Sequence, residues 1–82
     1  MWDKRGVIDH DGPELIWQQV ADDLRKDISS GTLPPGAKLP SEPELAEIYG
    51  VARVTVRTAM RSLEEAGLVV VTIGRGRFVA RR

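Results

Sequence analysis

Hydrophobic positions along the chain recur at helical spacing in three stretches, and each stretch predicts a helix with one buried face. The first covers residues 14–30 and begins beside Pro13, a residue suited to the first turn of a helix. The second begins at Ser41 and stops before Gly50, and the third covers residues 53–66. The third has an apolar arc made of Val56, Ala59, Met60, Leu63 and Ala66. The three helices are therefore expected to pack around one small core.

The second and third predicted helices are separated by a short turn, the arrangement of a helix-turn-helix. Ser41, with Glu44 three residues later, is typical of a capping box at the start of the second helix. Gly50 supplies a conformationally permissive residue at the turn. The preceding segment, residues 32–40, is rich in turn residues and leaves room for no more than a bridge-like strand at Lys38.

The residues after Gly67 are rich in β-branched side chains and bounded by glycines, which favours a hairpin. Residues 68–73 are predicted as its first strand, residues 74–76 (Gly-Arg-Gly) as its tip and residues 77–80 as its second strand. Phe78 is expected to anchor the hairpin to the core. The predicted order is helix, short strand, helix, helix and two-stranded hairpin, which makes a mainly α fold with a small β-hairpin.

The first twelve residues show no periodicity and are predicted to form a flexible N-terminal arm, distinct from a domain of residues 13–82. The alternative is that Trp2 and residues 7–8 dock on the domain or on a partner. Residues 9–11 (Asp-His-Asp) are of metal-ligand types, but a flexible segment lacks the preset geometry of a site. No metal site is therefore expected.

Composition limits the chain to a single small domain and excludes several functions. The 82 residues include no cysteine, so no disulfide or thiolate site can form and a reducing, cytoplasmic location is expected. No apolar run is long enough to span a bilayer, and no membrane partner is expected. Neither an activated nucleophile nor a tuned acid–base pair is visible. The chain is accordingly not expected to be an enzyme, and no cofactor is predicted.

Charge is unevenly distributed along this chain, although its net charge is zero. Residues 1–52 hold five Lys/Arg and ten Asp/Glu, a balance of −5, whereas residues 53–82 hold seven arginines and two glutamates, a balance of +5. A polyanion would be attracted to one side of such a molecule and repelled by the other. Charge alone does not distinguish DNA from RNA or from an acidic protein.

The arginines of the third predicted helix form a basic stripe. Arg53, Arg57 and Arg61 recur every four residues, on a side roughly 120° from the apolar arc. With this helix in a major groove, the planar side chain of Arg53 is placed to pair with O6 and N7 of guanine. Arg57, one turn further along the helix, is placed to contact a phosphate or a neighbouring base. Arg61 either reaches the nucleic acid or pairs with Glu64 or Glu65 on its own helix.

Three sequence blocks carry a family resemblance: LRKDISSGTLPPGAKLPSE, LAEIYGVARVTVRTAMRSLEEAGL and GRGRFV, all within residues 14–80. In these blocks and their spacing the chain resembles the N-terminal DNA-binding domain of the GntR family of bacterial transcription regulators. The resemblance implies a winged helix-turn-helix that binds a double-stranded DNA operator sequence-specifically and regulates transcription, most often as a repressor. The recognition helix, residues 53–66, would enter the major groove, and the wing tip, residues 74–76, would lie near the minor groove.

The resemblance also implies contacts for the start of the positioning helix, the start of the recognition helix and the wing tip. The matching residues are Ser41 and Glu42, then Arg53, Thr55 and Arg57, and then Gly74, Arg75 and Gly76. Two positions depart from the family pattern. Pro43 stands where relatives often carry a DNA-contacting basic residue, and Ala52 stands where the recognition helix usually opens with Ser or Thr. Both departures remove a contact, so base readout is expected to rest more heavily on Arg53.

Family relatives typically carry a C-terminal domain that binds a small effector and dimerises. A single winged domain reads one half-site. The resemblance therefore implies a homodimer on DNA, formed through a C-terminal domain not present in this chain, which is expected to be a piece of a longer regulator. The alternative is a winged-helix protein-interaction module without nucleic-acid binding, which the zero net charge and the acidic first half favour.

Overall fold

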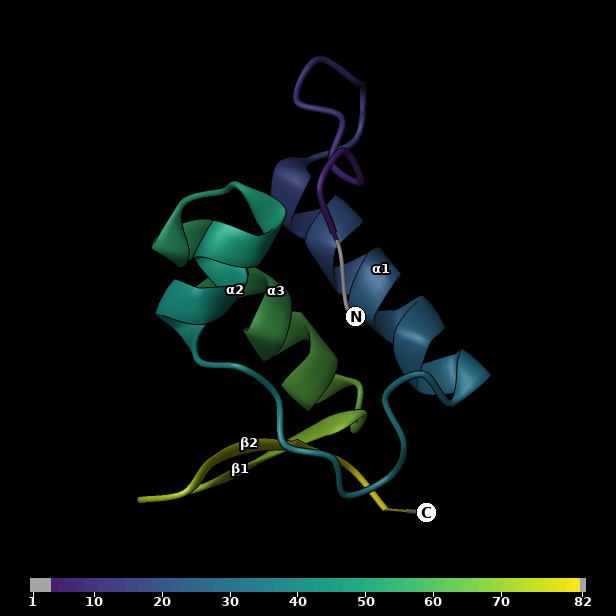
Figure 1. Ribbon diagram of the computed structural model, residues 1–82, viewed down its shortest axis with the longest axis vertical. Coiled ribbons are helices and arrows are strands. Elements are labelled where there is room, and N and C mark those ends of the chain that lie inside the picture. Colours follow the sequence, from purple (N-terminus) through teal and green to yellow (C-terminus); the bar gives the residue numbers. More distant parts are fainter. Residues whose placement is uncertain (1–3, 82) are drawn as a thin grey trace.

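The computed structural model describes residues 4–81, which form three helices followed by a two-stranded hairpin (Figure 1). The helices are α1, Ile16–Ser30, α2, Glu42–Tyr49, and α3, Arg53–Glu65, and the strands are β1, Val69–Thr72, and β2, Gly76–Val79. The hairpin β1–β2 is antiparallel and lies beyond the C-terminal end of α3, at the bottom of the view. This order confirms the predicted fold, a mainly α domain of winged helix-turn-helix type.

A hydrophobic core joins the helices to the hairpin. It includes Val20, Ala21 and Leu24 from α1, Leu45, Ala46 and Tyr49 from α2, Val56, Ala59, Met60 and Leu63 from α3, and Val69 and Val79 from the hairpin. Full burial of a Leu, Val or Met side chain contributes about 1.5–3 kcal/mol. The buried arc of α3 matches the predicted one except at Ala66, which is exposed beyond the helix end. Packing of this arc fixes which face of α3 points to solvent.

The ends of α2 follow the predicted signals. Ser41 Oγ accepts a hydrogen bond from the backbone N of Glu44 at 3.3 Å, and Glu44 Oε1 accepts one from the backbone N of Ser41 at 2.9 Å. The bond from the Ser41 backbone also lowers the pKa of the Glu44 carboxyl. Gly50 ends the helix with φ 71°, in the left-handed region that favours glycine. The capping box and the turn residue are both confirmed.

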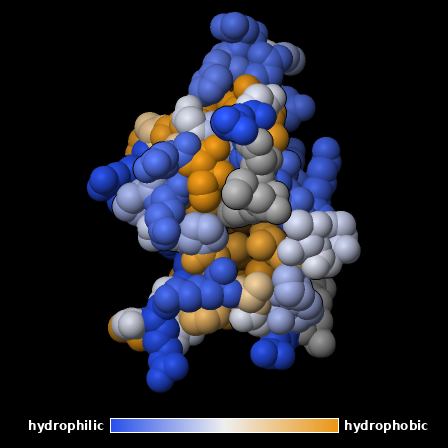
Figure 2. Space-filling model, viewed as in Figure 1, coloured by the Kyte–Doolittle hydropathy of each residue, from blue (hydrophilic) through white to orange (hydrophobic). Residues whose placement is uncertain are grey.

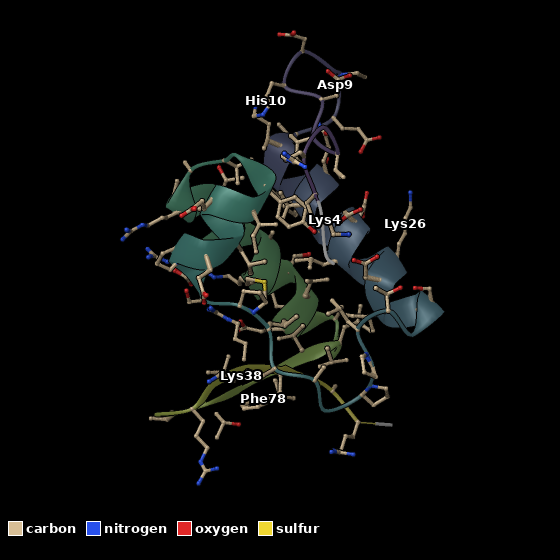
Figure 3. The ribbon with its side chains drawn as sticks, in the orientation of Figure 1. Lys4, Asp9, His10, Lys26, Lys38 and Phe78 are labelled. Carbon is tan, nitrogen blue, oxygen red and sulfur yellow. The ribbon has the colours of Figure 1, made fainter. Side chains whose placement is uncertain are left out.

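The segment of residues 4–12 packs against α1, which differs from the flexible arm expected from the sequence. Lys4 is buried, and its Nζ lies 2.7 Å from Asp23 Oδ2 and 2.5 Å from Asp27 Oδ2 (Figure 3). Burial lowers the pKa of Lys4, but its hydrogen bonds to the two carboxylates outweigh this effect and raise it above the ordinary value. Tyr49 Oη donates to the same oxygen of Asp23 at 2.6 Å, so the cluster links the segment to α1 and α2.

Hydrogen bonds between the Gln19 side chain and the backbone continue this packing up to the start of α1. The side chain of Gln19 accepts from the backbone N of Asp9 at 2.7 Å and donates to the backbone O of Asp9 at 2.9 Å. The Nε2 of Gln19 also donates a hydrogen bond to the backbone O of Glu14 at 3.1 Å. These bonds hold the chain ahead of the helix, and α1 begins at Ile16, two residues later than predicted. The predicted arm and domain also include residues 1–3, among them Trp2, and Arg82, which lie outside the described residues.

The hairpin is anchored by valines rather than by Phe78. Val69 and Val79 are paired across the two strands and are each 2% exposed. Phe78 is half-buried, and its side chain lies on the face of the hairpin that points away from the helices (Figure 3). Its backbone forms an isolated antiparallel bridge with Lys38 along the edge of β2. The expected anchor was therefore wrong, because successive residues of a strand face opposite sides and the inward position belongs to Val79. The bridge-like strand at Lys38 is confirmed.

Candidate nucleic-acid interface

The face of α3 opposite the core is exposed and basic. Arg53, Val54, Arg57, Thr58 and Arg61 are all exposed. Residues four apart lie on neighbouring turns of one helix face, so the three arginines form a continuous stripe. Thr58 Oγ1 donates to the backbone O of Val54 at 3.0 Å, which uses its hydroxyl proton within the helix. The predicted separation of basic and apolar faces is present in the structure.

Arg57 is held by the first residue of α2. Its Nε and Nη2 each lie 3.2 Å from Glu42 Oε1. The other carboxylate oxygen, Oε2, lies 3.1 Å from Nη1 of Arg77 in β2. Glu42 was expected to touch the phosphate backbone, but the structure directs both of its oxygens to arginines of the protein. Arg53, by contrast, forms no ion pair within residues 4–81.

Arg61 does not form the ion pair that was considered as its alternative. Glu64 accepts a hydrogen bond at 2.7 Å from Nε of Arg77, and Glu65 is exposed. In the described part of the chain neither glutamate forms an ion pair with Arg61. The guanidinium of Arg61 is therefore open to an outside ligand.

The N-terminus of α3 lacks a side-chain cap, because Ala52 occupies the capping position. The backbone O of Ala52 accepts from the amides of Thr55 at 3.1 Å and Val56 at 3.2 Å. The first amides of the helix, those of Arg53 and Val54, have no acceptor inside a helix. The helix dipole adds partial positive charge at this end. The free amide donors and the partial positive charge together make the N-terminus of α3 suited to binding an anion. Thr55 itself is half-buried in this first turn.

A groove runs between the start of α2 and the wing, and the predicted contact residues of both elements line it. Ser41 and Glu42 lie on one side, and Gly74, Arg75 and Gly76 lie on the other. In Figure 1 the wing tip projects toward the left of the view, the side on which α2 lies. Figure 2 shows hydrophilic side chains projecting from this side, over the wing at the lower left and over α2 above it. The structure thus brings these two predicted groups together.

The wing tip differs by one residue from the predicted one. The turn consists of Ile73, Gly74 and Arg75, while Gly76 opens β2 and pairs with Thr72. Gly74 has φ 80° and Gly76 has φ 110°, so both positions favour glycine. Ile73 is 97% exposed, and Arg75 is exposed beside it. Ile73 was predicted to end the first strand and was not among the predicted site residues.

The guanidinium of Arg77, in β2, is turned inward. It is 24% exposed, and its Nε and Nη1 bind Glu64 Oε2 at 2.7 Å and Glu42 Oε2 at 3.1 Å. Burial lowers the pKa of Arg77, but the hydrogen bonds to Glu64 and then to Glu42 outweigh it and raise the pKa. No local pattern in the sequence indicates this contact, since the partners belong to separate elements.

Other kinds of site find little support in residues 4–81. Within them no group of three or more His, Cys, Asp or Glu side chains is placed to hold a metal ion. Asp9 and His10 lie in the loop before α1, at the opposite end of the molecule from the hairpin (Figure 3). No helix in the described part of the chain is both long and apolar enough to cross a membrane. The basic face of α3 and the adjoining groove hold the predicted contact residues and form the candidate site.

A helix-turn-helix with a basic second helix, followed by a hairpin that reaches the same side, defines the winged helix-turn-helix class of protein. Residues 16–79 match the family described as "Bacterial regulatory proteins, gntR family". The match covers most of the chain, and the chain belongs to the GntR family of bacterial regulatory proteins.

Individual relatives agree with this membership. The HTH-type transcriptional repressor NagR of Bacillus subtilis (strain 168) is 40% identical over 74 residues, which are 90% of this chain and 30% of that protein. YtrA from Sulfolobus acidocaldarius, a GntR-family transcription factor, superimposes with a TM-score of 0.86 at 39% identity, covering 92% of this chain and 79% of that chain. The DNA-binding domain of AraR in complex with operator ORR3 superimposes with a TM-score of 0.74 at 36% identity, covering 84% and 87%. The chain spans less than a third of the length of the curated relatives it matches.

Proposed function

We propose that this chain binds double-stranded DNA sequence-specifically and so regulates transcription, as a repressor, with α3 in the major groove and the wing near the minor groove. One observation carries the proposal: the arginine face of α3 is exposed, while the groove beside it is lined by the start of α2 and the wing tip. The likeness to the AraR domain, whose structure contains operator DNA, supports it. The repressor name of NagR supports the direction of regulation.

Arg53 is the proposed base reader. It is exposed at the first turn of α3 and forms no ion pair within the described residues, so its full set of donors is open to guanine O6 and N7. The amides of Arg53 and Val54 and the hydroxyl of Thr55 would bind a phosphate at the helix N-terminus. Arg61, two turns further along, would reach a second phosphate.

Arg57 is the proposed phosphate contact at the boundary between α2 and α3. Its bonds to Glu42 hold the guanidinium in one orientation and leave Nη1 for a ligand. A carboxylate beside a phosphate would be repelled, so Glu42 acts through Arg57 rather than by touching the backbone. Ser41 Oγ accepts its capping bond from Glu44, and the hydroxyl proton remains available to a phosphate oxygen.

The wing supplies the proposed minor-groove contact. Arg75 is an exposed cation flanked by Gly74 and Gly76, and a narrow minor groove attracts such a side chain. Ile73, beside it, would contact sugars or base edges as an apolar group.

Dimerisation is part of the proposal. A single winged domain reads one half-site, and tight operator binding requires two domains related by symmetry. Because the chain spans only 24–30% of relatives such as Mce2R and NagR, we place dimerisation in a second domain of a longer polypeptide. Such a regulator would act in the cytoplasm.

Selection from a random duplex library tests the proposal. The chain is expected to enrich one short sequence, and Arg53→Ala should weaken binding to it by roughly 1–3 kcal/mol and relax one position. Backbone amide NMR signals should shift on titration with this duplex, with the largest shifts at residues 53–61 and 73–76. A protein-interaction module without nucleic-acid binding predicts no enrichment and no such shifts, and that result would reject DNA binding.

A further inference from the structure

We infer that Arg77 is a positioning residue that fixes the wing against α2 and α3 and thereby sets where Arg75 lies relative to the reading helix. The inference rests on the proposed function and adds a specific residue to it. Arg77 is itself turned away from solvent, between Glu42 of α2 and Glu64 of α3.

The direction of the Arg77 side chain follows from the register of the hairpin. Alternate residues of a strand face the same side, so Arg77 shares the inward face of β2 with Val79. Val79 is 2% exposed and packs in the core at the base of the hairpin. Arg77 lies on the same face two residues nearer the tip, beyond the edge of the core. Its neighbours there are two carboxylates, those of Glu42 and Glu64, instead of apolar side chains.

The tip half of the hairpin has few other attachments to the helices. Its β1 residues Val70 and Val71 are 47% and 52% exposed, and Ile73 at the tip is almost fully exposed. The backbone of Arg77 accepts a hydrogen bond from the N of Leu39 at 2.9 Å, which ties β2 to the loop before α2 rather than to the reading helix. An isolated two-stranded hairpin is marginally stable in water. The side chain of Arg77, through Glu64, therefore links the tip half directly to α3.

The contacts of Arg77 form one chain of alternating charge that joins three elements. It runs from Arg57 on α3 to Glu42 on α2, then to Arg77 on β2 and on to Glu64, which is again on α3. Three of the four side chains are less than a third exposed, so salt screens their pairing less than it screens a surface pair. Two carboxylates balance the two guanidiniums. Arg77 consequently offers little net charge to a phosphate and restrains the wing instead.

The direct consequence is that the contribution of Arg75 to DNA binding depends on Arg77. Arg77→Met removes the charge and keeps most of the side-chain length. On the duplex enriched by the parent chain, Arg75→Ala should weaken binding about tenfold. In the Arg77→Met background the same change should weaken it by no more than about twofold, because the loosened wing no longer delivers Arg75. Arg53→Ala should keep its full effect in both backgrounds, which a general loss of stability would not produce.

A phosphate contact by Arg77 itself predicts a different result. If Arg77 only positions the wing, Arg77→Met in the Arg75→Ala background should leave both the affinity and the salt dependence of DNA binding unchanged. A further fall of the salt slope by about 0.9 would reveal a lost phosphate contact and overturn the inference. Equal effects of Arg75→Ala with and without Arg77 would overturn it as well.

Hydrogen exchange in the free protein separates this inference from the proposed function. Arg77→Met should speed amide exchange at residues 74–76 relative to α3, and Glu64→Gln, which changes no shape, should do so to a smaller extent. Arg81→Met is the matched control, since this exposed arginine follows β2 and forms no ion pair among residues 4–81. Unchanged exchange in both variants would overturn the restraint. Faster exchange in a chain that binds no DNA would support the restraint and reject only the proposed function.

Discussion

Lys4 joins the N-terminal segment to α1 and α2, and its replacement by methionine tests whether that segment is a packed part of the domain. The ammonium group is buried against Asp23 and Asp27, and Asp23 also accepts the hydroxyl of Tyr49. Methionine fills a similar volume but leaves the two carboxylates facing each other without the cation. The substitution is expected to destabilise the fold.

The size of the effect follows from the degree of burial. Exposed ion pairs contribute about 0–1 kcal/mol, whereas breaking a fully buried pair costs about 3–5 kcal/mol. The side chain of Lys4 is 8% exposed, and those of Asp23 and Asp27 are 18% and 16% exposed, so the carboxylates keep some access to water. A loss of about 2 kcal/mol is therefore expected. For a domain of this size each kcal/mol lowers the melting temperature by about 4–8 °C.

Urea unfolding followed by circular dichroism measures the loss, and pH gives a second test. The pKa of Lys4 is raised in the folded state, so its contribution is complete below the unfolded pKa of about 10.4 and is lost as pH rises through the folded value. The pKa of Tyr49 is also raised, by burial and then by its bond to Asp23, and its contribution falls in the same alkaline range. The difference between parent and Lys4→Met should thus be constant at neutral pH and shrink above about pH 10.4.

Lys26→Met is the matched control, because Lys26 is an exposed lysine that projects from α1 into solvent (Figure 3). It should change stability by less than about 0.5 kcal/mol. Equal stability of parent and Lys4→Met would refute the reasoning and return residues 4–12 to the loose arm that the sequence predicts.

Four further substitutions test other parts of the structure. Ala52→Ser, at an extended capping position, should raise the free energy of unfolding by about 1 kcal/mol in urea titrations, and no gain would mean that the start of α3 is already satisfied. Gly50→Ala should lower it by about 1–2 kcal/mol through backbone strain alone, since nothing lies within 4 Å of an added Cβ; a neutral result would contradict the left-handed turn. Glu42→Gln should weaken DNA binding by roughly 0.5–1 kcal/mol although it removes a negative charge, whereas tighter binding would show that the carboxylate merely repels phosphate. Ile73→Ser should lower affinity in fluorescence anisotropy without altering the salt slope, because an apolar contact releases no counterions, and a changed slope would argue against an apolar contact.

Features determined by neighbouring residues could be predicted from the sequence. The capping box of Ser41 and Glu44 is a local pattern, as is the left-handed turn at Gly50, and both are present. The apolar arc of α3 was predictable because helical periodicity decides which side chains share a face. The start of α1 was not, because its position depends on bonds from Gln19 to a segment ten residues earlier.

The inward face of the hairpin could not be predicted from the pattern, because apolar residues stand on both faces of its strands. In the structure Val79 and Arg77 face inward, and Phe78 lies outside the core. In the sequence Arg77 is indistinguishable from a solvated surface arginine, because its carboxylate partners reach it only after the helices have packed.

The placement of charge explains why zero net charge is compatible with a DNA-binding role. Two carboxylates of α1 face Lys4, and two more, on α2 and α3, hold Arg77, so these groups are compensated inside the fold. Arg53, Arg61 and Arg75 have no ion pair in the described part of the chain. Asp22, the exposed acidic residue of α1, lies away from the inner face of this helix, which packs on α3. The domain is at least 25 Å across, about three times the Debye length of about 8 Å at physiological salt. A phosphate backbone at the exposed face of α3 would therefore experience mainly the nearby arginines, and the charge of that face rather than the net charge governs the encounter.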